Sequence, residues 1–105
     1  MDAQTRDRFA LRANILKAMA HPTRLFIVDA LSHHEQCVFK LAELIEADMS
    51  TVSRHLKILK EAGVIKDEKQ GTLVYYHLNV PCVKFLDCLE MIVRKTVNNT
   101  LTLMQ

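Results

Sequence analysis

Small hydroxyl and basic side chains are concentrated in residues 41–65, LAELIEADMSTVSRHLKILKEAGVI. Within this stretch Val52, Leu56 and Leu59 recur at spacings of four and three, so a helix capped by Asp48 should bury one face. The side chains left on the opposite face, near the helix start, are Ser50, Thr51, Ser53, Arg54 and Lys57. An arginine can donate two hydrogen bonds to one guanine, and hydroxyls can contact bases or phosphates. This face therefore predicts recognition of DNA.

The elements around this helix support the same interpretation. A shorter helix is predicted over residues 40–46, and a tight turn joins it to the helix that Asp48 caps. KDEKQGTLVYYHL follows, and it predicts strands over residues 64–68 and 72–78 with Gln70-Gly71 at the turn. Helix–turn–helix plus hairpin is how a winged helix places one helix in the major groove and a loop beside it. Lys69 and Gln70 at the tip would contact the minor groove or phosphates, or form a solvated turn.

Positive charge also lies in this part of the chain. The protein has fourteen lysines and arginines against twelve acidic residues, a net charge of +2. Residues 54–69 hold five of the cations and three of the anions, so the whole excess is located here. An ordinary amphipathic helix would also carry solvated charges, but it would not explain the hydroxyl residues and the hairpin. His55 borders the buried face, where we expect a partly buried, hydrogen-bonded imidazole rather than a base contact.

Two rival classes of protein fit less well. A winged helix used only for protein–protein contact would favour an acidic or apolar outer face on the helix after Asp48. An enzyme would need catalytic groups, and the sequence has no glycine-rich phosphate loop, no nucleophile with a spaced base and no credible pair of carboxylates. We therefore predict a protein that is not an enzyme.

Long helices are predicted at both ends of the chain. The first covers residues 3–20 and ends at His21-Pro22-Thr23, because the residue before a proline is pushed out of the α region. The last starts at residues 79–81. Their apolar stripes comprise Phe9, Ile15, Leu16 and Met19, and then Phe85, Leu86, Leu89, Ile92, Val93 and Val97. The second stripe exceeds what one small core needs, so it predicts a dimer face.

The remaining elements complete one domain over residues 1–105. A second helix is predicted over residues 23–31, a short strand over 37–39, and inward-facing Leu41, Leu44 and Ile45 on the third helix. The predicted fold class is mostly α with a small β-hairpin, a winged helix-turn-helix.

The N-terminus and the cysteines bear on the compartment. MDAQTRDRF has no signal-peptide core, and no stretch approaches the roughly 18 apolar residues of a membrane span. We expect a cytoplasmic protein with no membrane partner, in which Cys37, Cys82 and Cys88 are free thiols.

The runs LKAMAHPTRLFIVDAL, EQCVFKLAEL and STVSRHLKILKEAGVIKDEKQGTLVYYHL closely resemble the ArsR/SmtB family of bacterial winged-helix repressors, over residues 16–78. The resemblance implies a homodimer paired through the first and last helices. It also implies binding to double-stranded operator DNA with inverted symmetry, and release from that operator when an inducer binds.

The known inducer sites of that family are incomplete in this chain. The arsenic-sensing branch has a Cys-x-Cys pair at the start of the third helix, where this chain has Cys37 but then Phe39. The zinc-sensing branch uses Asp and His on the last helix, and no His follows Pro81. The branch that senses persulfides or oxidants has a cysteine in the second helix, where this chain reads LFIVDAL.

Three thiols remain as candidate ligands, Cys37, Cys82 and Cys88. Thiolates select arsenite and soft metal ions. On one helix, Cys82 and Cys88 would point about 120° apart and lie about 9 Å apart along the axis, so they chelate one ion only if the helix starts after Cys82. A Cys37 strand paired with the returning hairpin strand would bring Cys37 near Cys82, within one protomer or across the dimer.

The thiols fit two further roles. Cysteine also behaves as a small buried hydrophobe, which is the favoured role for Cys88 beside Phe85 and Ile92. A redox or reactive-sulfur sensor of the same fold is the alternative to an inducer such as arsenite, an organoarsenical or a soft metal ion. We expect no required cofactor.

Overall fold

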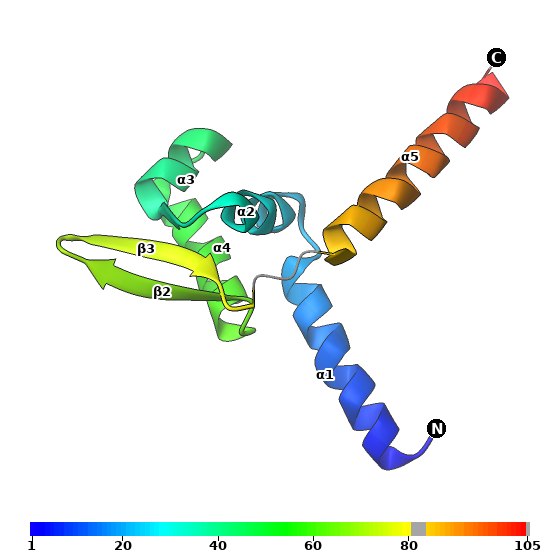
Figure 1. The fold of residues 1–105 in the computed structure, drawn as a ribbon, viewed down its shortest axis with the longest axis horizontal. Helices are drawn as coiled ribbons and strands as arrows, with labels where there is room; N and C mark the ends of the chain where they lie inside the picture. Colours follow the sequence, from blue (N-terminus) through cyan, green and yellow to red (C-terminus); the bar gives the residue numbers. More distant parts are fainter. Residues whose placement is uncertain (81–83, 105) are drawn as a thin grey trace.

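The computed structural model describes residues 1–80 and 84–104, and for residues 99–104 it describes the backbone alone. The chain is mostly helical with one small sheet, as predicted. The elements in order are α1 (Ala3–Met19), α2 (Pro22–His33), β1 (Gln36–Cys37), α3 (Val38–Ile45), α4 (Met49–Glu61), β2 (Ile65–Gln70), β3 (Leu73–Leu78) and α5 (Lys84–Met104). Figure 1 shows α2, α3, α4 and the sheet gathered into a body, from which α1 and α5 project as two separate arms.

The predicted break between the first two helices is confirmed. α1 ends at Met19, and His21 caps α2 with its ring nitrogen Nδ1, which accepts a hydrogen bond from the Thr23 backbone amide. Pro22 is the first residue of α2, where its missing N–H costs nothing. α2 runs on to His33, so the loop before the sheet is shorter than predicted.

Two helix starts differ from the prediction. The short strand ends at Cys37, whose extended backbone caps α3, so Val38 and Phe39 belong to a helix that begins two residues earlier than expected. The strand ends there because its pairing with β3 ends there. At the other end, α5 is described from Lys84; Asn79 and Val80, at the predicted start of the last helix, are not helical, and Pro81 lies outside the described residues.

The sheet is antiparallel, with strand order β1-β3-β2. Cys37 lies opposite Tyr75, so the predicted pairing of the short strand with the returning hairpin strand is confirmed. Ile65 pairs with Leu78 at the base of the hairpin. The turn is centred on Gly71 and Thr72, one residue later than predicted, and Gly71 supplies a φ of +66° that favours glycine.

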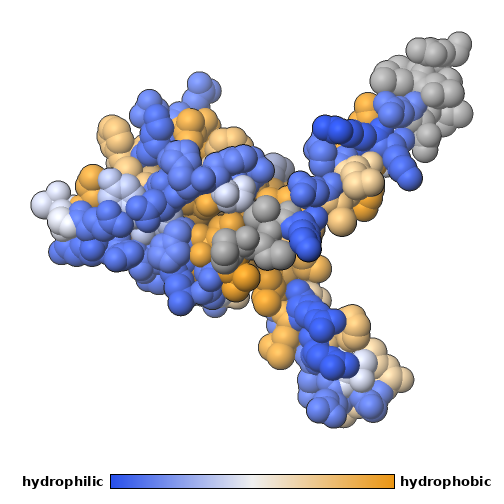
Figure 2. Space-filling view, viewed as in Figure 1, coloured by the Kyte–Doolittle hydropathy of each residue, from blue (hydrophilic) through white to orange (hydrophobic). Residues whose placement is uncertain are grey.

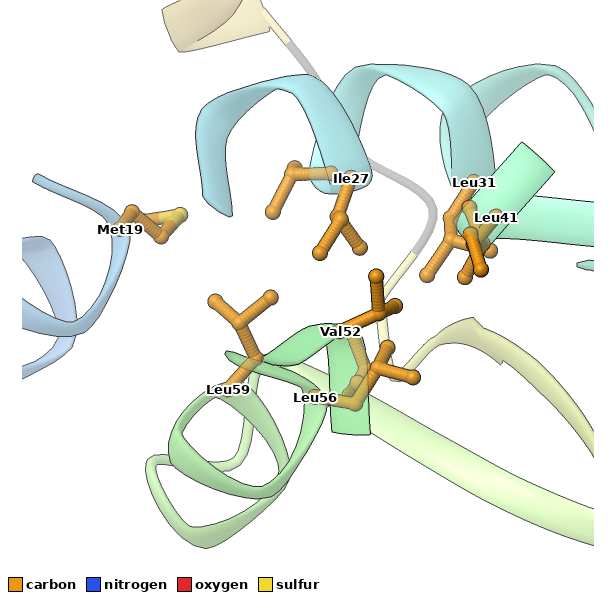
Figure 3. Close-up of a cluster of buried hydrophobic side chains, with 10 residues drawn as sticks. Met19, Ile27, Leu31, Leu41, Val52, Leu56 and Leu59 are labelled. Carbon is orange, nitrogen blue, oxygen red and sulfur yellow. The ribbon is translucent and has the colours of Figure 1, made fainter. Parts of the chain in front are cut away.

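The hydrophobic core lies between α2, α3, α4 and the base of the hairpin. Figure 3 shows side chains from these three helices pointing toward one another, with Met19 reaching in from the end of α1. Those that are almost fully buried are Ile27, Val28, Leu41, Val52, Leu56, Leu59 and Ile65. The predicted inward position of Leu44 is wrong. Leu44 is 44% exposed and lines an open groove with Pro22 and Phe26 instead of packing in the core.

The two arms bury little of their apolar surface. In α1 only Ala18 and Met19 are buried, and among the α5 side chains that the structure describes, residues 84–98, only Phe85 and Leu86 pack against the core. The radius of gyration is 16.5 Å, whereas a compact chain of this length has about 13 Å. In Figure 2 apolar atoms gather where α1 leaves the body, around a groove lined by Ile15, Met19, Val28, Gly63, Val64, Leu78, Val80 and Phe85. No helix among residues 1–80 and 84–104 has the length and apolar character to cross a membrane.

Candidate nucleic-acid interface

Asp48 starts the predicted recognition helix, as the sequence indicated. Its carboxylate Oδ1 accepts a hydrogen bond from the Thr51 backbone amide at 2.9 Å. Hydrogen bonds from the Thr51 hydroxyl and amide hold the pKa of Asp48 below its ordinary value. This cap satisfies one of the free N–H groups of the first turn and keeps α4 regular up to its N-terminal end.

The two faces of α4 are arranged as predicted. Val52, Leu56 and Leu59 are at most 1% exposed. Ser50, Ser53, Arg54 and Lys57 are consequently exposed, whereas Thr51 is half-buried beside its cap. Neither Arg54 nor Lys57 forms an ion pair within the described part of the chain. The two cations are therefore available to an anionic partner.

One of the cations counted from the sequence has an internal partner instead. The Lys60 ammonium donates to the Asp67 carboxylate at 2.8 Å, and this ion pair connects α4 to β2. The hydrogen bond from Lys60 to Asp67 raises the pKa of Lys60 above its ordinary value. Sequence reasoning missed this pair because the two residues meet only when the hairpin folds back on the helix.

The tip of the hairpin carries Lys69 and Gln70, and both are exposed. Successive strand residues point to opposite faces, so the two side chains point away from each other. Lys69 shares its face with Ile65 and Asp67, the face that meets α4. Gln70 donates to the Glu35 carboxylate at 3.4 Å, a contact that connects the tip to the loop before β1.

His55 is half-buried on the flank of α4, as predicted, and has a hydrogen-bond partner. Its Nδ1 lies 3.3 Å from the Arg24 Nη1, and its ring lies 4.6 Å from the ring of His21. Arg24 also donates from Nε to the Ala18 carbonyl at the end of α1, at 2.5 Å. Sequence reasoning did not identify Arg24. The available signal was a charged residue in the first turn of a helix that follows a proline break.

Two of the three candidate thiols lie in the described part of the chain. Cys37 is half-buried between β1 and α3, and Cys88 is exposed on α5. Cys82 lies outside the described residues. Within the described part of the chain, no group of three His, Cys, Asp or Glu side chains could hold a metal ion.

A family model described as bacterial regulatory protein, arsR family, matches residues 21–67. An uncharacterised HTH-type transcriptional regulator of Methanocaldococcus jannaschii is 37% identical over 73 residues, which cover 69% of this chain and 82% of the relative. A cadmium resistance transcriptional regulatory protein, a CadC homologue of Staphylococcus aureus, is 43% identical over 75 residues, which cover 70% of this chain and 62% of the relative.

The comparison with solved structures indicates the same family. A solution structure of a homodimeric winged helix-turn-helix DNA-binding domain from Mycobacterium bovis, a possible ArsR-family transcriptional regulator, superposes with a TM-score of 0.76 and 27% identity. The match covers 90% of this chain and 88% of that one. The winged helix-turn-helix predicted from the sequence is thereby confirmed. By sequence and by fold, this chain belongs to the arsR family of bacterial regulatory proteins.

Proposed function

We propose that this protein is a homodimeric transcriptional repressor that binds operator DNA through α4. The observation that carries the proposal is the exposed face of α4 over residues 50–57, where Ser50, Ser53, Arg54 and Lys57 face solvent. The unpaired cations supply phosphate or guanine contacts, and the hydroxyls supply short hydrogen bonds to either. The hairpin beside α4 adds Lys69 to the same basic surface, while Gln70 and Thr51 are partly engaged within the protein.

The apolar arms support the homodimer. α1 exposes Phe9, Leu11, Ile15 and Leu16, and α5 exposes Leu89, Met91, Ile92, Val93 and Val97. A monomer would leave this surface in water, whereas a second copy would cover it. A two-fold dimer presents two copies of α4, so the operator should be an inverted repeat with half-sites about one helical turn apart.

Substitution of Arg54 tests DNA recognition. Arg54→Ala should weaken binding to an operator duplex by about 1–3 kcal/mol, because a bidentate base contact is lost while the fold is kept. Arg94→Ala is the matched control, because it removes an exposed arginine from α5. The measurement is a gel-shift titration at fixed salt. Equal affinities for Arg54→Ala and wild type would remove Arg54 from the reading surface.

We further propose that the inducer is sensed through thiols. The ligand would be arsenite, an organoarsenical or a soft metal ion, since thiolates bind soft ions preferentially. Cys37 supports this proposal by its place. It caps α3, the first helix of the helix–turn–helix, and its strand pairs with β3, which ends at Leu78, four residues before Cys82. The staphylococcal relative is named for cadmium resistance.

Release from DNA would follow from movement of α3. An ion that draws Cys37 toward Cys82 would shift α3 relative to α5, and with it the angle between the two copies of α4 in the dimer. The inducer needs only a higher affinity for this state than for the DNA-bound one. Cys88, exposed on α5, is the third candidate ligand.

Substitution of Cys37 tests this sensing mechanism. Cys37→Ser keeps the size of the side chain and removes the soft ligand, so the variant should bind operator normally but resist release by arsenite or cadmium. Release of the variant at the wild-type concentration would make Cys37 a packing residue. Cys88→Ser tests the third candidate ligand in the same assay. Release by persulfide, but by neither ion, would favour the alternative, a redox or reactive-sulfur sensor of the same fold.

A second class of function remains as an alternative, a winged helix used for protein–protein contact. It would require the exposed face of α4 to bind a protein. Absence of enrichment of any duplex from a random-sequence DNA library would favour it.

A further inference from the structure

Arg24 connects three helices through one guanidinium group. Its Nε donates to the Ala18 carbonyl, one of the last carbonyls of α1, which have no partner within the helix. Its Nη1 lies 3.3 Å from Nδ1 of His55, in the middle of α4. The end of α1 and the flank of α4 are thus bound to the same side chain of α2.

The donor chemistry of arginine determines the state of His55. A guanidinium group only donates hydrogen bonds, so Nδ1 of His55 must be the acceptor and must carry no proton. The same holds for His21, whose Nδ1 accepts from the Thr23 amide in its role as the cap of α2. The two imidazoles, whose rings are tilted by 43°, therefore keep these hydrogen bonds only while each Nδ1 carries no proton.

We propose that Arg24 is a positioning residue for DNA recognition, which holds α4 against the end of α1 through His55, and that protonation of His55 releases α4 from this contact. The inference rests on the proposed function, because positioning matters only if α4 reads DNA. α1 is one of the two arms of the proposed dimer. A contact between α1 and α4 therefore relates the reading helix to the dimer axis.

The charges around His55 determine the direction of the pH effect. The groups that act on it are His21 and Arg24 of α2 and Arg54 of its own helix, while α1 contributes the Ala18 carbonyl on the other side of Arg24. Burial lowers the pKa of His55 below 6.5, and the nearby His21, Arg24 and Arg54 lower it further. Protonation would add a positive charge to a site with no carboxylate among these groups.

The lowered pKa of His55 makes the stability of the folded chain depend on pH. A histidine with a depressed pKa stabilises the folded chain fully above its ordinary value, and this contribution is lost as the pH falls through the lower, folded value. Acid therefore breaks the contact between Arg24 and His55. The proposal predicts weaker operator binding at acidic pH, although a protonated imidazole near DNA would by charge alone strengthen it.

The first experiment separates positioning from a direct phosphate contact. The probe is a duplex selected from a random-sequence library by repeated binding to the wild-type chain. Arg24→Met should lower its affinity about tenfold, the equivalent of one charged hydrogen bond. Arg24→Lys should be nearly as weak, because a point charge cannot span Ala18 and His55. Restoration of binding by Arg24→Lys, or a salt slope reduced by about 0.9 in Arg24→Met, would indicate a phosphate contact and overturn the proposal.

The second experiment uses the pH profile. His55→Asn keeps an acceptor oxygen near the position of Nδ1 and does not titrate, so it should bind close to the wild-type level at about pH 7.5. As the pH falls from about 7.5 through the lowered folded pKa of His55, wild type should lose operator affinity that His55→Asn retains. An equal loss in both proteins, or a gain for wild type, would overturn the role of His55.

The third measurement requires no DNA. Nitrogen-15 NMR of the free wild-type chain should show His55 protonated only at Nε2 at neutral pH, and Arg24→Met should raise its pKa by removing a cation. An Nδ1-protonated tautomer, or an unchanged pKa in Arg24→Met, would refute the contact itself. If no duplex is ever selected, the proposed function fails. The NMR result still decides whether the junction around Arg24, which joins Ala18 of α1 to His55 of α4, exists.

Discussion

The body and the arms of this protein use apolar residues in opposite ways. In the body, Ile27, Leu41 and Leu56 are at most 1% exposed and close one core. In the arms, residues of the same kind lie in the open, among them Leu16 at 57% and Ile92 at 61%. A single chain thus buries the apolar side chains of the body but leaves those of the arms exposed.

This difference supports the proposal that one small domain both binds DNA and forms a dimer. The core of the body positions α4 by burying Val52, Leu56 and Leu59 within a single chain. The exposed apolar side chains of α1 and α5 form a large surface of the kind that marks an interaction site. The junction around Arg24 lies at the boundary between the two regions, where α1 joins the body.

Truncation of a leucine in each region should give the largest contrast. Leu56→Ala opens a cavity in the body and should cost about 2–5 kcal/mol of unfolding free energy at every protein concentration. Leu89→Ala, in the half-exposed stripe of α5, should cost little in dilute solution and more as the concentration rises. Chemical denaturation over a range of concentrations measures both. A concentration-independent loss in Leu89→Ala would mean that the arm is stabilised within one chain.

A charge placed on the arm should next disrupt assembly alone. Ile92→Lys puts an ammonium group into the proposed dimer face and should weaken the dimer by roughly 2 kcal/mol or more, as for a truncated interface hot spot. Asp87→Lys is the matched control, since Asp87 is exposed and the helical period places it on the side of α5 opposite the stripe. Sedimentation equilibrium reports the result. A dimer that tolerates Ile92→Lys would place the interface elsewhere.

The smallest effect concerns the helix cap of the body. Asp48→Ala removes the acceptor for the Thr51 amide and should lower stability slightly, whereas Asp48→Asn keeps the cap without the charge. Because the folded pKa of Asp48 is depressed, its contribution is present above 3.8 and lost as the pH falls through the lower folded value. Thermal melts across acidic pH should therefore show a decline in wild type that Asp48→Asn lacks. The same decline in Asp48→Asn would assign it to other groups.

Much of the exposed face of α4 was predictable from the sequence because it depends on local rules. The spacing of Val52, Leu56 and Leu59 orients every other side chain on α4, and Asp48 marks where the helix starts. Proline at position 22 sets a boundary in the same way. Helix period and capping depend on residues within a few positions of one another, so both can be recognised in the sequence.

Predictions failed where neighbours distant in the sequence decide. Leu44 has the right period for burial, yet it is exposed and lines an open groove with Pro22 and Phe26. Val38 and Phe39 look β-prone, but β1 extends only as far as β3 pairs with it. In both cases the local preference is weak, and packing decides the outcome.

By itself, then, the sequence determined the elements, the exposed face of α4 and the winged-helix arrangement, because periodicity, caps and turns are local. Only the tertiary structure decided which charges are available. Lys60 is paired with Asp67 and Gln70 with Glu35, and Arg24 connects Ala18 to His55. These contacts join residues up to 35 positions apart. Which long side chains meet depends on how helices and strands pack, and no local pattern specifies that.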